Sequence, residues 1–112
     1  MRILALVLFL VVAGLSPAMS ATLTPTHSTG SCTNASSEML AENLGRTAAL
    51  IINDGATDIW IKIGATAVAN EGILIVPNGS YFLAWDAANA NTDAINCISG
   101  GTIVVLVTEW AR

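Results

Sequence analysis

Basic residues are scarce in this sequence of 112 residues, and their scarcity excludes whole classes of partner. Four Lys and Arg stand against eight Asp and Glu, and the formal net charge is −4. Binding to nucleic acid requires clustered cations that displace counterions from phosphates, and no such cluster exists here. The acidic balance also gives no attraction to anionic lipid. We therefore expect no nucleic-acid partner, and membrane contact only through residues 1–20 if that segment is retained.

Residue types that carry catalysis or bind metals are equally sparse. The one histidine, His27, lies in a segment rich in Thr, Ser and Pro, which could not hold it rigidly beside a nucleophile. This histidine and two distant cysteines fall short of the about four ligands of a zinc site. Asp54 and Asp58 are typical of turn residues, because the loop between them lacks the dense oxygen ligands of a calcium site. The sequence predicts a protein that is not an enzyme, with no metal and no cofactor.

A long apolar run occurs once, at the N-terminus. Residues 3–15 are apolar apart from Gly14, Arg2 precedes them, and small residues occupy most of positions 18–20. A positive start, an apolar core and small residues are the three parts of a secretory signal, and the run is short for a membrane span of about 20 residues. We predict that residues 1–20 are a cleaved signal peptide, with a retained membrane anchor as the alternative.

The sequence contains two cysteines, Cys32 and Cys97, and both follow the predicted cleavage site. In an oxidising compartment an isolated pair of cysteines usually forms one disulfide. Closing a loop of this size would stabilise the fold by about 4 kcal/mol in the chain-entropy model. Two buried thiols that act as small apolar groups are the alternative. We predict the disulfide, on condition that the protein is exported.

The chain after residue 20 divides into a linker and a domain. Residues 21–30 are rich in Thr, Ser and Pro without periodicity, which predicts a flexible linker. Residues 31–112 contain short β-branched and aromatic segments separated by turn residues, among them the hairpin signal Asp54-Gly55. The predicted strands cover residues 47–53, 59–63, 73–76, 80–85, 94–98 and 102–110, and residues 33–40 are either a first strand or an irregular lead-in. No amphipathic helix is apparent, so we predict an all-β fold, a small antiparallel β-sandwich that is jelly-roll-like or immunoglobulin-like.

The final predicted strand is apolar on both faces, which a strand with one face in water should not be. Either a long loop covers its outer face or that face contacts another subunit. A small domain with so much apolar surface is also expected either to be tightly packed or to bury part of its exterior against a neighbour. On outward faces, Trp60, Trp85 and Trp110 could anchor an interface or stack on sugar rings, although capping the ends of the core is the simpler role. The candidate interface residues are Trp60, Lys62, Val104, Leu106 and Trp110.

Several segments follow one another in an order that resembles a known group. They are SEMLAENLGR (37–46), LIINDG (50–55), IWIKIG (59–64), GILIVPNGSY (72–81), DAINCISGGT (93–102) and VTEW (107–110). This order is similar to that of small tailed-phage proteins encoded among structural genes, which are minor virion or decoration components. The resemblance implies an all-β sandwich with a structural role and no catalytic residues, in which Arg46 pins a turn to the sheet. Such phage proteins generally lack a secretory signal, and Cys97 takes the place of a small or aromatic residue.

We therefore expect a non-enzymatic structural or decoration protein of a virion that acts through subunit or lattice contacts. Its partners would be its own copies or capsid and tail proteins, and it would lie on the virion surface or be exported to the periplasm or the medium. The alternative is a secreted or periplasmic adhesion or carbohydrate-binding module that uses the same tryptophans. A small secreted enzyme or inhibitor is the third possibility.

Overall fold

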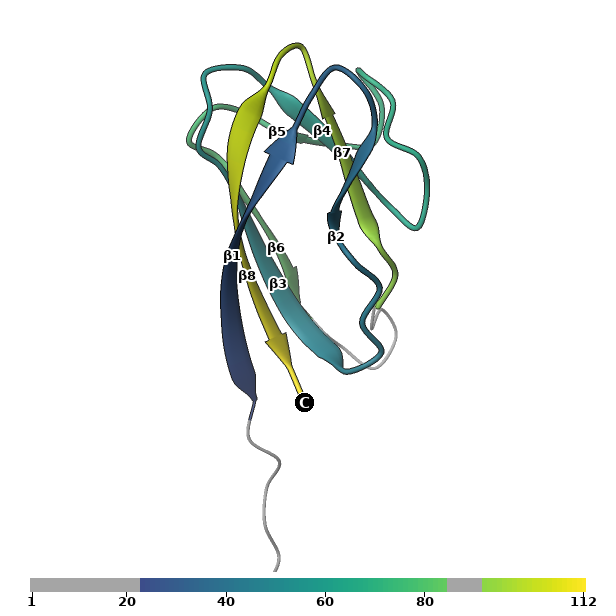
Figure 1. The fold of residues 1–112 in the computed structure, drawn as a ribbon, viewed down its shortest axis with the longest axis vertical. Helices are drawn as coiled ribbons and strands as arrows, with labels where there is room; N and C mark the ends of the chain where they lie inside the picture. Colours follow the sequence, from purple (N-terminus) through teal and green to yellow (C-terminus); the bar gives the residue numbers. More distant parts are fainter. Residues whose placement is uncertain (1–22, 85–91) are drawn as a thin grey trace, which may run out of the picture.

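The computed structural model describes residues 23–84 and 92–112, which form eight β-strands and no helix (Figure 1). The strands are β1 (Thr24–Cys32), β2 (Ser37–Leu40), β3 (Arg46–Asn53), β4 (Ile59–Ile63), β5 (Ile73–Ile75), β6 (Ser80–Ala84), β7 (Ile95–Ser99) and β8 (Ile103–Ala111). The predicted all-β class is confirmed. The predicted signal or anchor at residues 1–20 lies outside the described residues, among which no helix is long and apolar enough to span a membrane.

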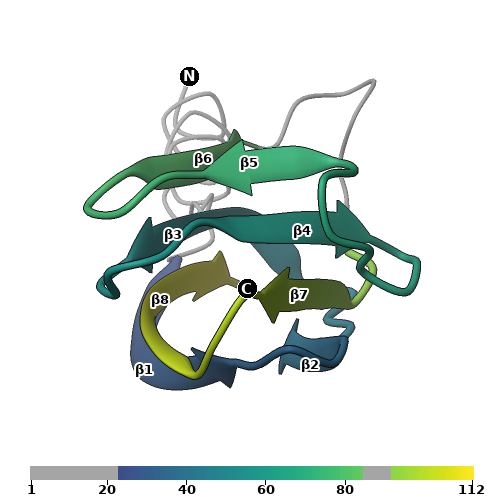
Figure 2. The same ribbon diagram turned by 90° about the horizontal axis from the view of Figure 1, so that it is seen from above.

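The strands form two antiparallel four-stranded sheets that pack as a sandwich. Sheet A has the order β1-β8-β3-β6 and sheet B the order β2-β7-β4-β5. Seen from above, the two sheets face each other. In this view β1 lies opposite β2, β8 opposite β7, β3 opposite β4 and β6 opposite β5 (Figure 2). Among the described strands, β4 and β5 are the only neighbours in sequence that also pair with each other. Each of the other six connections between these strands therefore crosses from one sheet to the other.

The hairpin predicted at Asp54-Gly55 is wrong, because β3 belongs to sheet A and β4 to sheet B. A two-residue type I′ hairpin requires positive φ at both central residues, and neither of these residues has it. The buried Asn53 side chain closes the turn instead. Its Oδ1 accepts from the Gly55 N–H at 2.9 Å, and its Nδ2 donates to the carbonyl oxygens of Thr57 at 2.8 Å and Ile75 at 2.9 Å. These bonds direct the chain across the sandwich rather than back along β3.

The core lies between the sheets and follows the alternation of the central strands. In β4, Ile59 and Ile61 are fully buried while Trp60 and Lys62 point outward, as the sequence predicts. In β8, alternate residues are buried in the same way from Ile103 to Val107. The largest fully buried side chains are Ile51, Ile59, Ile61, Ile95, Val105, Asn53, Cys32 and Cys97. The alternation predicted for residues 59–63 thus assigns the inner face of β4 correctly, and β8 alternates in burial although its sequence is apolar on both faces.

The flexible linker predicted for residues 21–30 is wrong from Thr24 onward, because these residues belong to β1. The strand pairs with β8 along its whole length, from Thr24 opposite Ala111 to Cys32 opposite Ile103. Most of its side chains are exposed, so it shows no apolar alternation that the sequence could reveal. Threonine nevertheless suits a pleated strand, and β8 supplies the backbone partners. The strand is therefore specified by its partner rather than by its own pattern.

The predicted disulfide is present and joins the two sheets through the core. Cys32 ends β1 in sheet A and Cys97 lies in the middle of β7 in sheet B, with their Cα atoms 5.7 Å apart. Both residues are fully buried. Because disulfides persist in oxidising environments, this bond indicates an exported or extracellular protein.

Arg46 ties three segments together at one end of the sandwich. Its Nε donates to Glu109 Oε2 at 2.6 Å, and its terminal nitrogens donate to the carbonyl oxygens of Asp93 at 2.8 Å and Ala41 at 2.6 Å. Asn43 Nδ2 donates to the other oxygen of Glu109 at 3.0 Å. The Arg46 side chain is 1% exposed. The arginine thus holds the turn before β3 against β8 of sheet A.

Candidate interaction surface

The outer face of sheet A follows from the register of its four strands. Residues directly opposite each other in antiparallel strands project from the same face. Leu106 of β8 is opposite Thr29 of β1 and Ile52 of β3, which places all three on the side away from the core. The residues of this outer face are Pro25, His27, Thr29 and Ser31 of β1, Val104, Leu106, Thr108 and Trp110 of β8, Ala48, Leu50 and Ile52 of β3, and Ser80 and Phe82 of β6.

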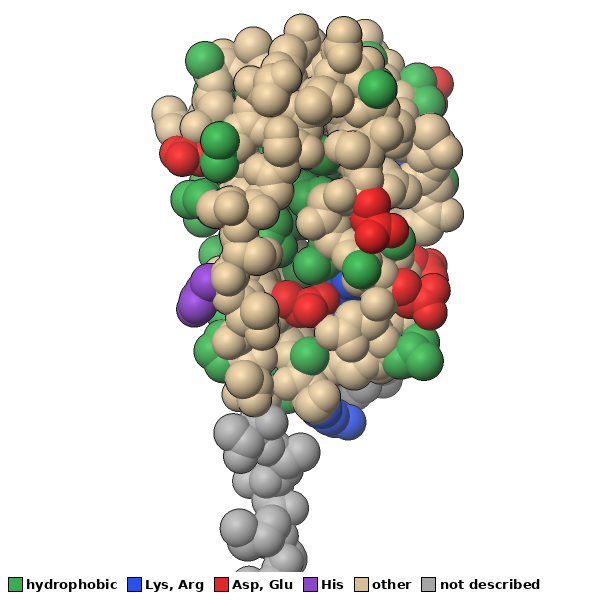
Figure 3. Space-filling view, viewed as in Figure 1, with side chains coloured by type: hydrophobic (Ala, Val, Ile, Leu, Met, Phe, Trp, Pro, Cys, Tyr) green, Lys and Arg blue, Asp and Glu red, His purple; other side chains and the backbone are tan. Residues whose placement is uncertain are grey.

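The outer face of sheet A contains no Asp, Glu, Lys or Arg and exposes large apolar side chains. Phe82 is 55% exposed, Val104 48% and Leu106 37%. These exposures show that no described segment covers the outer side of β8, so a loop does not account for its second apolar face. On the side of the molecule that Figure 3 shows, most of the acidic side chains, in red, lie over the half that carries β2 and β7. The surface predicted to meet another subunit is therefore open in the single chain.

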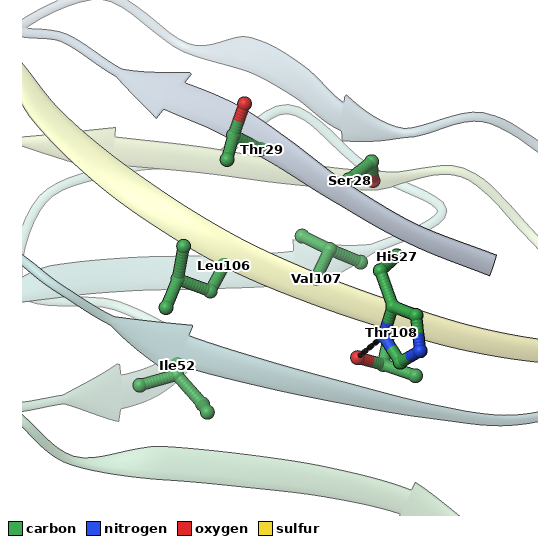
Figure 4. Close-up of a pocket in the computed structure, with 7 residues that line it drawn as sticks. All are labelled: His27, Ser28, Thr29, Ile52, Leu106, Val107 and Thr108. Carbon is green, nitrogen blue, oxygen red and sulfur yellow. Dashed lines mark hydrogen bonds between the residues drawn. The ribbon is translucent and has the colours of Figure 1, made fainter. Parts of the chain in front are cut away.

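The outer face of sheet A carries a ridge and a hollow. Phe82 and Trp110 form the ridge, with ring centroids 6.1 Å apart and planes at 79°. The hollow, of about 500 Å³, lies over β1, β8 and β3, where Thr29 and Thr108 are short beside Leu106 and Ile52. Figure 4 shows the His27 ring beside Thr108, and its Nδ1 lies 2.9 Å from the Thr108 hydroxyl oxygen. The outer face of sheet A is thus uneven in shape and mostly apolar.

The outer face of sheet B differs in charge. Trp60 is opposite Ile98 and Leu74, and it is only partly exposed. Lys62 Nζ lies 2.8 Å from Glu71 Oε2, with 27% of the lysine side chain and 57% of the glutamate side chain exposed. This face therefore presents an ion pair beside its aromatic residue.

The five candidate interface residues do not form one surface. Trp60 and Lys62 lie on the outer face of sheet B, whereas Val104, Leu106 and Trp110 lie on the outer face of sheet A. A single contact surface that combines the two sets was the wrong expectation, because the chain changes sheet between β3 and β4 and again between β7 and β8. Trp85 and most of the loop after it lie outside the described residues.

Comparisons with known proteins add little. No family model matches the chain, and no curated protein matches it. A solved structure described as Bacillus endospore appendages that form a novel family of disulfide-linked pili aligns with a TM-score of 0.46 and 14% identity, over 88% of this chain and 96% of that chain. A TM-score below 0.5 does not establish a common fold, and the assembly of those pili says nothing about this chain.

Sequence reasoning missed the residues that flank β8 on its outer side. Leu50 and Ile52 of β3, Phe82 of β6 and His27 of β1 all belong to the outer face of sheet A. The sequence did carry one signal of a second apolar face on β3. Residues 47–53 have apolar side chains at both odd and even positions, as the last strand does. Within the described ranges, no three His, Cys, Asp or Glu side chains are placed to hold a metal ion.

Proposed function

We propose that this chain is a non-enzymatic structural module of a virion or other exported assembly, and that it docks to a neighbouring subunit through the outer face of sheet A. The observation that carries the proposal is a whole sheet face without a charged residue, on which Phe82, Val104 and Leu106 are 37–55% exposed. A monomeric soluble protein rarely leaves a contiguous apolar patch of this kind uncovered. The disulfide supports the exported setting.

The strand order supports a jelly roll as the finer description of the fold. Sheets with the orders β1-β8-β3-β6 and β2-β7-β4-β5 fit two Greek keys wound into a double-sheet jelly roll, which an immunoglobulin-like order does not match. Jelly rolls occur in viral capsid and lectin domains. Together with the resemblance to small tailed-phage proteins, this architecture supports a place on a virion, as an analogy of fold.

The carbohydrate-binding alternative has less support in the described residues. Stacking on a sugar ring requires an open aromatic face, and both Trp60 and Trp110 are only partly exposed. Trp110 also packs edge-to-face with Phe82. The exposed apolar side chains around them suit protein contact better than polar sugar hydroxyls.

The docking function is tested by Leu106→Glu in the organism or phage that encodes the chain. Leu74→Glu is the matched control, because Leu74 is 51% exposed on the outer face of sheet B. We expect the wild-type chain and the Leu74→Glu variant in sedimented particles or appendages, and the Leu106→Glu variant in the soluble fraction, because docking would bury an unpaired carboxylate. Incorporation of Leu106→Glu at the wild-type level would contradict the proposal.

A further inference from the structure

We infer that the subunit docked on the outer face of sheet A is a second copy of this chain, packed face to face about a two-fold axis that runs along the strands. The inference rests on the proposed function, since it names the partner of the same face. Two identical faces can pack about a two-fold axis only if the face is complementary to itself in charge and in shape.

The charge distribution favours self-contact on this face above any other. The chain has a net charge of −4, so two copies repel each other over most of their surfaces. The acidic residues of the described ranges lie in loops, in β2 or on the inner side of β8. They are Glu38, Glu42, Asp54, Asp58, Glu71, Asp93 and Glu109. The outer face of sheet A is the one sheet face on which two copies meet without like charges.

The shape of the outer face of sheet A is complementary to itself about a two-fold axis along the strands. A two-fold axis along the strands places β6 of one copy over β1 of the other, and β3 over β8, at the same height along the strands. Phe82 and His27 occupy the same row of the register, through Leu50 and Thr108 between them. Phe82 of each copy therefore faces the hollow beside His27 of the other copy.

The size of the face determines how tightly the copies bind. Four strands about 4.8 Å apart and seven residues of about 3.4 Å each, from Val104 to Trp110, span roughly 450 Å². Two such faces cover about 900 Å² in projection, which is below the roughly 1,200–2,000 Å² of stable specific interfaces and in the range of weak, transient contacts. The pair is therefore a weak, reversible dimer in solution, of the kind that a repeated assembly strengthens by multiple contacts.

Sedimentation velocity of the purified, oxidised chain tests the self-association. We expect a dimer fraction that rises with concentration for the wild type and for Leu74→Glu, and an association constant at least about tenfold lower for Leu106→Glu. Circular dichroism melting checks that both variants are folded. A wild type that stays monomeric up to about 1 mM, where even contacts worth about 4 kcal/mol become populated, would overturn the inference.

Cysteine pairing tests the geometry. We expect a mixture of Phe82→Cys and His27→Cys chains to form a covalent mixed dimer under mild oxidation, and either chain alone to form far less. A His27→Cys chain that crosslinks mainly to itself would indicate pairing of two β1 edges and would overturn the face-to-face arrangement. The two proposals fail separately. A monomeric wild type whose incorporation into particles still depends on Leu106 overturns the second copy as partner and leaves the docking function intact.

Discussion

Replacing Arg46 with methionine should cost the domain a large part of its stability. Methionine fills much of the same volume but removes the donors to Glu109, Asp93 and Ala41. The Glu109 carboxylate, whose side chain is only 15% exposed, then keeps the Asn43 amide but loses its counter-charge. Breaking a buried ion pair from one side costs about 3–5 kcal/mol. Domains of this size are stable by about 5–15 kcal/mol in total, so the loss is a third or more of a typical value.

The measurement is urea unfolding of the oxidised protein, followed by tryptophan fluorescence and circular dichroism. With a slope of about 1 kcal/mol per molar urea for a small domain, the midpoint should fall by about 3 M or more. Lys62→Met is the control, because its ion pair with Glu71 has a similar distance of 2.8 Å but is much more exposed, at 27% and 57% of the two side chains. Exposed pairs contribute at most about 1 kcal/mol, so the control midpoint should move by about 1 M or less.

Burial is the reason for the difference between the two variants, and the outcome can refute it. If Arg46→Met and Lys62→Met shift the midpoint equally, burial of the Arg46–Glu109 pair does not determine its cost. A double variant, Arg46→Met with Glu109→Leu, provides a further check. Apolar replacement of both partners is often neutral, so its midpoint should lie closer to that of the wild type than to that of Arg46→Met.

Two further predictions concern the disulfide and the turn after β3. Reduction of the Cys32–Cys97 bond, which closes a separation of 65 residues, should lower the free energy of unfolding by about 4 kcal/mol. Urea unfolding with and without reductant measures this change, and equal midpoints would contradict it once mass spectrometry has confirmed reduction. Gly55→Ala would place a Cβ 2.5 Å from Ile103 Cβ and should destabilise by about 1–3 kcal/mol. Gly100→Ala, with nothing within 4 Å, should leave the melting temperature nearly unchanged, and equal shifts in the two variants would show that the Ile103 contact is not the cause.

Local pattern predicted most strands and the inward or outward direction of their side chains. Ile59 and Ile61 face the core and Trp60 and Lys62 face outward because period-two alternation depends only on the strand's own residues. The second apolar face of β8 was visible in the same way, since Val104 and Leu106 interrupt the expected polar positions. The disulfide followed from counting cysteines and from the expected compartment.

Pairing between distant strands could not be predicted from those patterns. β1 is held by β8, about eighty positions away in the sequence, and its own Thr-rich stretch carries no apolar alternation. The change of sheet at Asp54-Gly55 depends on hydrogen bonds of Asn53 to Thr57 and Ile75, which a turn signal does not encode. For the same reason, the sequence placed Trp60 and Leu106 on one surface although they lie on opposite sides of the sandwich.

The pairing of Thr24 with Ala111 has a mechanical consequence. Both ends of the domain leave from the same end of sheet A, so tension between a tethered N-terminus and the C-terminus would separate β1 from β8 one residue pair at a time. Such unzipping stops at Cys32, because its covalent bond to Cys97 diverts the force past residues 33–96. A domain pulled in this way would lengthen by a limited amount and keep most of sheet B folded.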